Sequence, residues 1–275
     1  MHIDNPAHRP SSPVRGAYGP DPLWVDGVDV VLARTRFHAE KPGGSMGGFV
    51  GFDPYSRRKL LVKEALSDRH AACETLANCL YRALAIQCPD VRWGTLEGDP
   101  VTLGPWMDGY APVGDYARLP ESDLDLIAGF FPADVWLANW DVIGMVYDNL
   151  LYDPRARGSR RFLHIDTGGA LLFRAQGQSK GGAFGPSASE YENFTVPGKG
   201  SKSAYAVFGA VADVRSRRGK MLPMVRSIAM LATGGYVRKA ARWAGFDADE
   251  ALILDGIMRA RALDLADRIL HDPRK

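Results

Sequence analysis

The sequence predicts an α+β protein: a small β-rich N-terminal region with one helix, then a larger, mainly helical C-terminal region. Short apolar runs separated by Gly, Pro and Asp fill the chain up to about residue 106. Helical periodicity interrupts them once, over residues 68–84. From Ala204 onward the spacing is mainly helical. At 275 residues the chain can form one large domain or two small lobes that share a cleft.

The β-rich region is expected to follow a flexible leader. Residues 1–22 are rich in Pro, Ser, Gly and Arg. The β-prone run 28–32 predicts a first strand. A glycine-rich turn over 41–48 and apolar runs at 49–52 and 59–65 then predict an antiparallel hairpin system.

One helix and short strands complete this region. Asp68 is the expected N-cap of the helix over 68–84, and Pro89 stops it. Alternating apolar residues over 91–106 predict the strands. We therefore assign residues 23–108 to an N-terminal lobe.

Residues 109–275 form the predicted C-terminal lobe. A helix is expected over 121–138, with a possible break at Pro132. Residues 174–203 are rich in Gly, Ser and Lys and predict a loop. Two short strands and a long helix are also predicted, over 150–152, 162–165 and 249–270.

The composition excludes several classes of protein. A formal net charge of +2 is too small to indicate nucleic-acid binding. No stretch approaches the roughly 18 apolar residues of a membrane span, and the N-terminus lacks the apolar core of a signal peptide. The three cysteines have no paired zinc spacing. We therefore expect a cytoplasmic protein.

The glycine-rich turn is a candidate phosphate-binding loop. Backbone amides without side chains can approach phosphate oxygens closely, and a hairpin tip is a common place for this. The glycines concerned are Gly43, Gly44, Gly47 and Gly48. The alternative is a turn that binds nothing.

Lys63 and Glu74 are a candidate pair. Lys63 ends an apolar strand and either points to solvent or reaches into a cleft. Glu74 lies on the helix that follows, and alone would be read as an exposed helical residue. This order, after a glycine hairpin, is typical of a lysine that binds phosphate and is held by a carboxylate.

The segment 139–169 carries the sharpest signal. Asp141, Asn149 and Asp166 are oxygen donors at loop or strand ends, around a hairpin that brings them together. Divalent cations such as Mg²⁺ prefer oxygen ligands and leave positions for substrate phosphates. Gly168-Gly169 allows a sharp turn beside Asp166. The alternative is that these residues only cap turns.

Three blocks resemble the catalytic and metal-binding motifs of the protein-kinase-like superfamily. They are Asn139-Trp140-Asp141, Asp148-Asn149-Leu150-Leu151 and Ile165-Asp166-Thr167-Gly168-Gly169. The nearest likeness is to the atypical branch, which includes HipA-like kinases, actin-fragmin kinase and the phosphatidylinositol kinases. Upstream, the loop Gly43-Gly44-Ser45-Met46-Gly47-Gly48, Lys63 and Glu74 resemble the glycine loop, strand lysine and helix glutamate of that superfamily. The resemblance covers residues 40–170.

The resemblance implies a bilobal protein-kinase-like fold with ATP and Mg²⁺ between the lobes. The glycine loop, including Ser45 and Met46, would bind nucleotide, Lys63 would contact its phosphates and Glu74 would hold the lysine. Asp141 would be the catalytic aspartate. Asn149 and Asp166 would be the metal ligands.

One departure concerns the catalytic aspartate. The family places its Asn five positions after the catalytic Asp, whereas the gap here, from 141 to 149, is eight. Either the loop carries an insertion around 143–145, or Asp148 shares the catalytic role. We expect Lys63 to face Asn149 and Asp166 across a cleft.

Other polar residues have simpler interpretations. The basic segment 174–220, which includes Lys180 and Arg217, predicts a solvated loop, with an activation-loop-like segment as the alternative. His164 is expected to be packed or hydrogen-bonded. His70 is expected at the surface or in a cap.

The sequence therefore predicts an ATP- and Mg²⁺-dependent kinase that phosphorylates a hydroxyl acceptor, with a protein Ser or Thr favoured. A small-molecule acceptor, as in metabolite or antibiotic kinases, is the first alternative. A nucleotide-binding pseudokinase and an AMP-transferring enzyme on the same fold stay open.

Overall fold

The N-terminal region is built on a five-stranded antiparallel sheet with the order β1-β2-β3-β5-β4. The structure is a computed structural model that describes residues 22–38, 47–113, 116–211 and 214–271. The elements of this region are the 3₁₀ turn η2 (Pro22–Trp24), α1 (Val28–Arg34), β1 (Arg36–Phe37), β2 (Gly48–Asp53), β3 (Arg58–Glu64), α2 (Asp68–Ala83), β4 (Arg92–Leu96) and β5 (Asp99–Pro105).

The C-terminal region is mainly helical, with a three-stranded sheet in the order β6-β7-β8 beside it. Its strands and α-helices are β6 (Ala111–Pro112), α3 (Glu121–Trp136), β7 (Leu150–Tyr152), β8 (Phe162–His164), α4 (Glu190–Thr195), α5 (Lys202–Val211), α6 (Val214–Thr233), α7 (Tyr236–Trp243) and α8 (Ala248–His271). Its 3₁₀ turns are η3 (Tyr116–Arg118), η4 (Gly158–Arg161), η5 (Thr167–Gly169) and η6 (Gly181–Ala183). The predicted α+β class, with a β-sheet region before a helical part, is confirmed.

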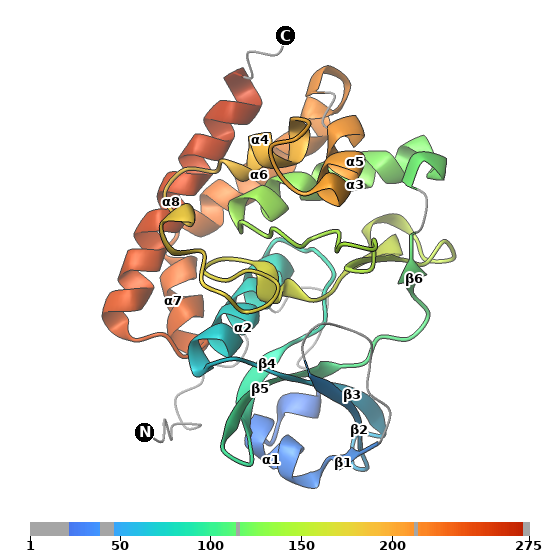
Figure 1. The fold of residues 1–275 in the computed structure, drawn as a ribbon, viewed down its shortest axis with the longest axis vertical. Helices are drawn as coiled ribbons and strands as arrows, with labels where there is room; N and C mark the ends of the chain where they lie inside the picture. Colours follow the sequence, from blue (N-terminus) through green and yellow to red (C-terminus); the bar gives the residue numbers. More distant parts are fainter. Residues whose placement is uncertain (1–21, 39–46, 114–115, 212–213, 272–275) are drawn as a thin grey trace.

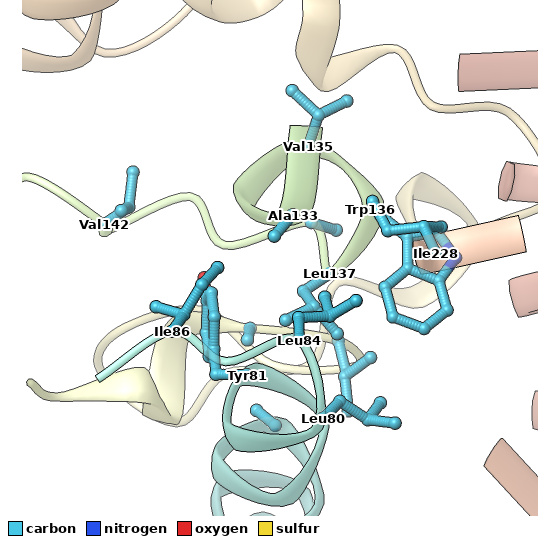
Figure 2. Packing of buried hydrophobic residues seen from close by; sticks show 14 of the residues in the cluster. Leu80, Tyr81, Leu84, Ile86, Ala133, Val135, Trp136, Leu137, Val142 and Ile228 are labelled. Atoms are coloured by element: carbon cyan, nitrogen blue, oxygen red, sulfur yellow. The ribbon is translucent and has the colours of Figure 1, made fainter. Parts of the chain in front are cut away.

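The helix α2 joins the two regions. It lies between the sheet and the helices of the C-terminal region (Figure 1). Figure 2 shows Leu80 and Tyr81 of α2, and Leu84 directly after it, beside Trp136 and Leu137 at the end of α3. These residues belong to the larger of two hydrophobic cores, so α2 is anchored to the C-terminal region by burial of apolar surface.

The smaller core lies on the other face of the sheet, where α1 packs. It joins residues of α1 to alternate residues of β3 and β5, namely Val28, Val31, Leu32, Leu60, Val62, Val101 and Leu103, together with Leu23. The strand predicted over 28–32 is therefore wrong. Valines favour strands, but burial at three- and four-residue spacing, with Val30 left 51% exposed, makes this segment a helix.

Two details of the predicted helices also differ. The N-cap of α2 is Ser67 rather than Asp68, because the Ser67 hydroxyl accepts a hydrogen bond from the His70 amide at 3.1 Å. The helix α3 runs unbroken through Pro132. The flanking residues are buried in the larger core, which compensates for the lost backbone donor.

The predicted hairpins form where expected. β2 pairs with β3, and β7 with β8, both antiparallel. The short strands expected over 91–106 are β4 and β5, which also pair antiparallel. Among the residues described, none of the helices combines the length and the apolar character needed to cross a membrane.

Candidate active site

Lys63 lies near the end of β3 and points into the space between the two regions. Its neighbour Val62 packs against α1, so the alternation of the strand directs Lys63 to the opposite face, toward α2. Its Nζ lies 2.9 Å from Glu74 Oε1 and 2.6 Å from Asp166 Oδ1. Burial favours the neutral amine, but the two carboxylates outweigh it and raise the pKa of Lys63, so the ammonium stays charged.

Glu74 is fixed from two sides. It lies on the face of α2 that packs against the sheet and is buried. One carboxylate oxygen contacts Lys63, and the other accepts a hydrogen bond from Thr102 Oγ1 of β5 at 3.1 Å. The carboxylate that holds the lysine is thus itself held by the neighbouring strand.

Asp166 follows β8 in a left-handed backbone conformation, with φ 52° and ψ 55°. Few residues other than glycine adopt it, although Asp tolerates it better than most. The next residue, Thr167, fastens the turn to α2 by accepting a hydrogen bond from Asn78 Nδ2. A Cβ on Gly169 would lie 3.0 Å from Asp141 Cβ, so glycine there lets the turn approach the loop of Asp141.

Asp141 and Asn149 are joined directly. Asn149 Nδ2 donates to the Asp141 carbonyl at 2.7 Å and to Asp141 Oδ2 at 2.9 Å. The Asn149 amide also donates to the Ile143 carbonyl at 3.3 Å. The eight-residue spacing is therefore accommodated by a loop whose base is closed by Asn149. Asp148 is exposed within this loop.

Negative charge accumulates around Asp141. Partial burial, the Asp166 carboxylate and the Asp148 carboxylate raise the pKa of Asp141 to about 6, against the hydrogen bond from Asn149, which lowers it. The Lys63 ammonium, which pairs with Asp166, lowers the pKa of Asp141 but offsets only part of this repulsion. A bound divalent cation would remove this repulsion.

The donor set suits Mg²⁺ in kind. The Asn149 amide nitrogen is taken by Asp141, which leaves the Asn149 side-chain oxygen as an acceptor. Asp141 and Asp166 add carboxylates. Within the described ranges, no group of three or more His, Cys, Asp or Glu could hold a metal alone. Carboxylate and amide oxygens are the kind of ligand that Mg²⁺ binds, and water and substrate phosphates would complete its coordination.

Only the end of the candidate glycine loop is described. Gly47 and Gly48 lead into β2, where Gly48 pairs with Lys63. A Cβ on Gly47 would meet the carboxylate of Glu64, an exposed side chain that can move away, so this contact does not require glycine. The other four candidate residues, Gly43, Gly44, Ser45 and Met46, lie outside the described residues.

The prediction that 174–220 is a solvated basic loop is wrong for two of its residues. Lys180 is only 4% exposed, and burial lowers its pKa to about 7. Arg217 is also buried and pairs with Glu121. Lys180 stands between Ser179 and Gly181, without an apolar pattern that could have revealed its burial.

The two histidines lie in different environments. His164 is buried, as predicted, with its ring 5.2 Å from that of Tyr81 and its Nε2 3.4 Å from Asp134 Oδ1. Of the two positions expected for His70, the surface is wrong and the cap is right, because its amide donates to the Ser67 hydroxyl at 3.1 Å and its Nδ1 accepts from the Leu66 amide at 3.4 Å. The His70 side chain is buried beside Gly168, and burial lowers its pKa, so it is neutral at pH 7.

Comparisons with known proteins give only distant structural likeness. No protein-family model matches the chain, and no curated protein does. A solved structure, the Helicobacter pylori proinflammatory kinase CtkA, matches at 13% sequence identity with a TM-score of 0.49, over 84% of this chain and 97% of that one. At this identity and score, the likeness assigns neither a family nor an activity to the chain.

Proposed function

We propose that this chain is an ATP- and Mg²⁺-dependent phosphotransferase of the protein-kinase-like kind. The arrangement that carries the proposal is the contact of one ammonium with two carboxylates. Lys63, on a strand of the N-terminal region, meets Glu74 on a helix and Asp166 on a loop of the C-terminal region. Phosphoryl transfer is catalysed mainly by positioning and by neutralisation of charge, which such a cluster provides.

The residues divide the binding of nucleotide and metal between them. Lys63 would contact phosphate oxygens, held by Glu74 in an orientation fixed by Thr102. Asp166 and the side-chain oxygen of Asn149 would hold Mg²⁺. When bound, the metal would neutralise charge on the transferred phosphoryl group.

Asp141 is the better candidate to orient the acceptor hydroxyl. It is partly buried, bonded to Asn149 and close enough to Asp166 for their charges to interact. The rival Asp148 is exposed. A carboxylate with a pKa near 6 accepts a hydrogen bond from a hydroxyl at pH 7 while it stays ionised.

Incubation of the purified full chain with labelled ATP, Mg²⁺ and acceptors tests the proposal. We expect label from the γ-phosphate of ATP to reach the chain itself or a generic protein acceptor such as casein, and to be lost in Asp166→Ala. Label on a sugar or aminoglycoside instead of protein would identify a small-molecule kinase.

Two other results would overturn the proposed activity. Label only from the α-phosphate would identify AMP transfer on the same fold. Nucleotide binding without transfer of either label would identify a pseudokinase.

We favour a protein Ser or Thr acceptor, the HipA-like branch and a cytoplasmic setting, from the motif blocks and from the lack of a membrane-spanning helix in the described ranges.

A further inference from the structure

Lys180 is buried next to the candidate active site, where three carbonyl acceptors around its Nζ favour the ammonium against the effect of burial. Its Nζ donates to the carbonyl oxygens of Ala138 at 2.6 Å, Gly169 at 2.8 Å and Leu171 at 2.9 Å. An ammonium has three N–H groups, so these carbonyls use all of them. The lysine that the sequence suggests is solvated thus makes only internal contacts.

The three carbonyls belong to the two loops that carry Asp141 and Asp166. Ala138 precedes Asp141 by three residues, and Gly169 and Leu171 follow Asp166. Ala138 and Leu171 have φ of 51° and 54°, in the left-handed region. Carbonyls at such turns fall outside helix and strand ladders, so buried ones need another donor, and Lys180 supplies it.

Backbone hydrogen bonds join these two loops at fewer points than the bonds from Lys180 do. Leu171 N donates to Leu137 O at 2.7 Å, and Trp140 N donates to Gly169 O at 3.3 Å. The second bond, adjacent to Asp141, is long. Lys180 adds three shorter or comparable bonds on the same two loops, including one to the same Gly169 carbonyl.

Lys180 has no direct counter-ion within the described ranges. The charged and titratable groups that act on it are Glu190 of α4, Arg261 of α8, Arg174 and the thiol of Cys73 in α2. Glu190 is engaged by Arg261 in an ion pair of 2.6 Å. Burial of a lysine without a carboxylate costs free energy, so packing does not account for a lysine at this position.

We propose that Lys180 is a positioning residue, which holds the loop of Asp141 and the loop of Asp166 in register through their backbone carbonyls. The proposal rests on the proposed function, because the register matters for transfer between a metal-bound phosphate and a hydroxyl. It extends the site to a residue that contacts neither the phosphate nor the acceptor hydroxyl.

The test uses three variants of the full chain. Lys180→Met removes the charge and the donors at similar length. Lys180→Arg keeps both, and Lys199→Met is the matched control on an exposed lysine of the same segment. We expect Lys180→Met to lower kcat on the order of 10- to 100-fold with KM for Mg-ATP little changed. Lys180→Arg should recover part of the loss and Lys199→Met should show none. If Lys180→Met does not fold, Lys180→Gln is measured in the same way.

Amide hydrogen exchange separates this proposal from the proposed function. In Lys180→Met, peptides over 137–142 and 166–172 should lose protection while peptides of α8 keep theirs. This readout needs no activity, so it decides the role of Lys180 even if the wild type transfers no phosphate. Wild-type kcat in Lys180→Met, an Arg variant no better than Met, or loss of protection in α8 as well would each overturn the proposal.

Discussion

Lys63 Nζ lies 2.6 Å from Asp166 Oδ1, across the boundary between the sheet and the helical region. The two residues are 103 positions apart in the sequence. Because Glu74 also contacts the ammonium, one cation is shared by two carboxylates. In this cluster a phosphate could bind near the lysine, and a divalent cation near Asp166.

Lys63→Met tests the shared cation. We expect phosphoryl transfer to be lost and the free energy of unfolding to fall by about 3 kcal/mol, since the buried Glu74 keeps only its bond to Thr102. Transfer assays and urea unfolding measure the two effects. Lys59→Met, on an exposed position of the same strand, should change neither. Retained transfer in Lys63→Met would remove the lysine from the site.

Asp141→Asn and Asp148→Asn decide between the two candidate catalytic aspartates. We expect Asp141→Asn to lower kcat about 10²- to 10⁴-fold, the range of a lost general base. Asp148→Asn should stay within a few-fold of wild type, because its side chain is exposed. Initial rates at saturating Mg-ATP measure both. The reverse order of effects would assign the role to Asp148.

The kcat/KM for Mg-ATP should rise with pH through about 6, because this ratio reports the ionisation of the enzyme before the metal and nucleotide bind. Partial burial and the carboxylates of Asp166 and Asp148 raise the pKa of Asp141 to about 6, and only the ionised form accepts the hydroxyl proton. In Asp148→Asn the rising limb of the pH profile should move to lower pH, because one negative charge near Asp141 is removed. The profile of kcat/KM against pH measures this. A limb that does not move would place Asp148 too far away to act on Asp141.

The raised pKa of Asp141 also determines how the free energy of unfolding changes with pH. Between about pH 4 and pH 6 the native state binds more protons than the unfolded state at Asp141, since its native pKa is higher. The contribution of Asp141 to the free energy of unfolding therefore decreases as the pH rises through this window. In metal-free protein, Asp141→Asn should make the free energy of unfolding less dependent on pH there.

The sequence predicted the hairpins and the order of Lys63, Glu74 and Asp166 because these are local signals. Alternating apolar residues mark the strands, and polar residues at their ends are visible in the chain. The run 28–32 was not predictable in this way. Its valines carry β-propensity, and only burial against Leu60 and Val62 makes it a helix.

Lys180 and the Arg261–Glu190 pair were missed for a different reason. The partners of Lys180 are backbone carbonyls, which every residue has, so no residue type marks them. Arg261 and Glu190 are 71 positions apart, and each is a common surface residue type. Long-range polar contacts of this kind leave no periodicity in the sequence.

Arg261→Leu should destabilise the chain and shift the loop of Asp141. Arg261 and Glu190 are both 0% exposed and form an ion pair of 2.6 Å, while Trp140 Nε1 donates to the other oxygen of Glu190 at 2.8 Å. Loss of the arginine leaves a buried carboxylate with only the indole as donor, which costs about 3–5 kcal/mol. Urea unfolding followed by tryptophan fluorescence measures it. Arg155→Ala, which removes an ion pair from an arginine 77% exposed, should cost less than about 1 kcal/mol. Equal effects in the two variants would show that the buried pair does not hold Trp140 and the adjacent Asp141.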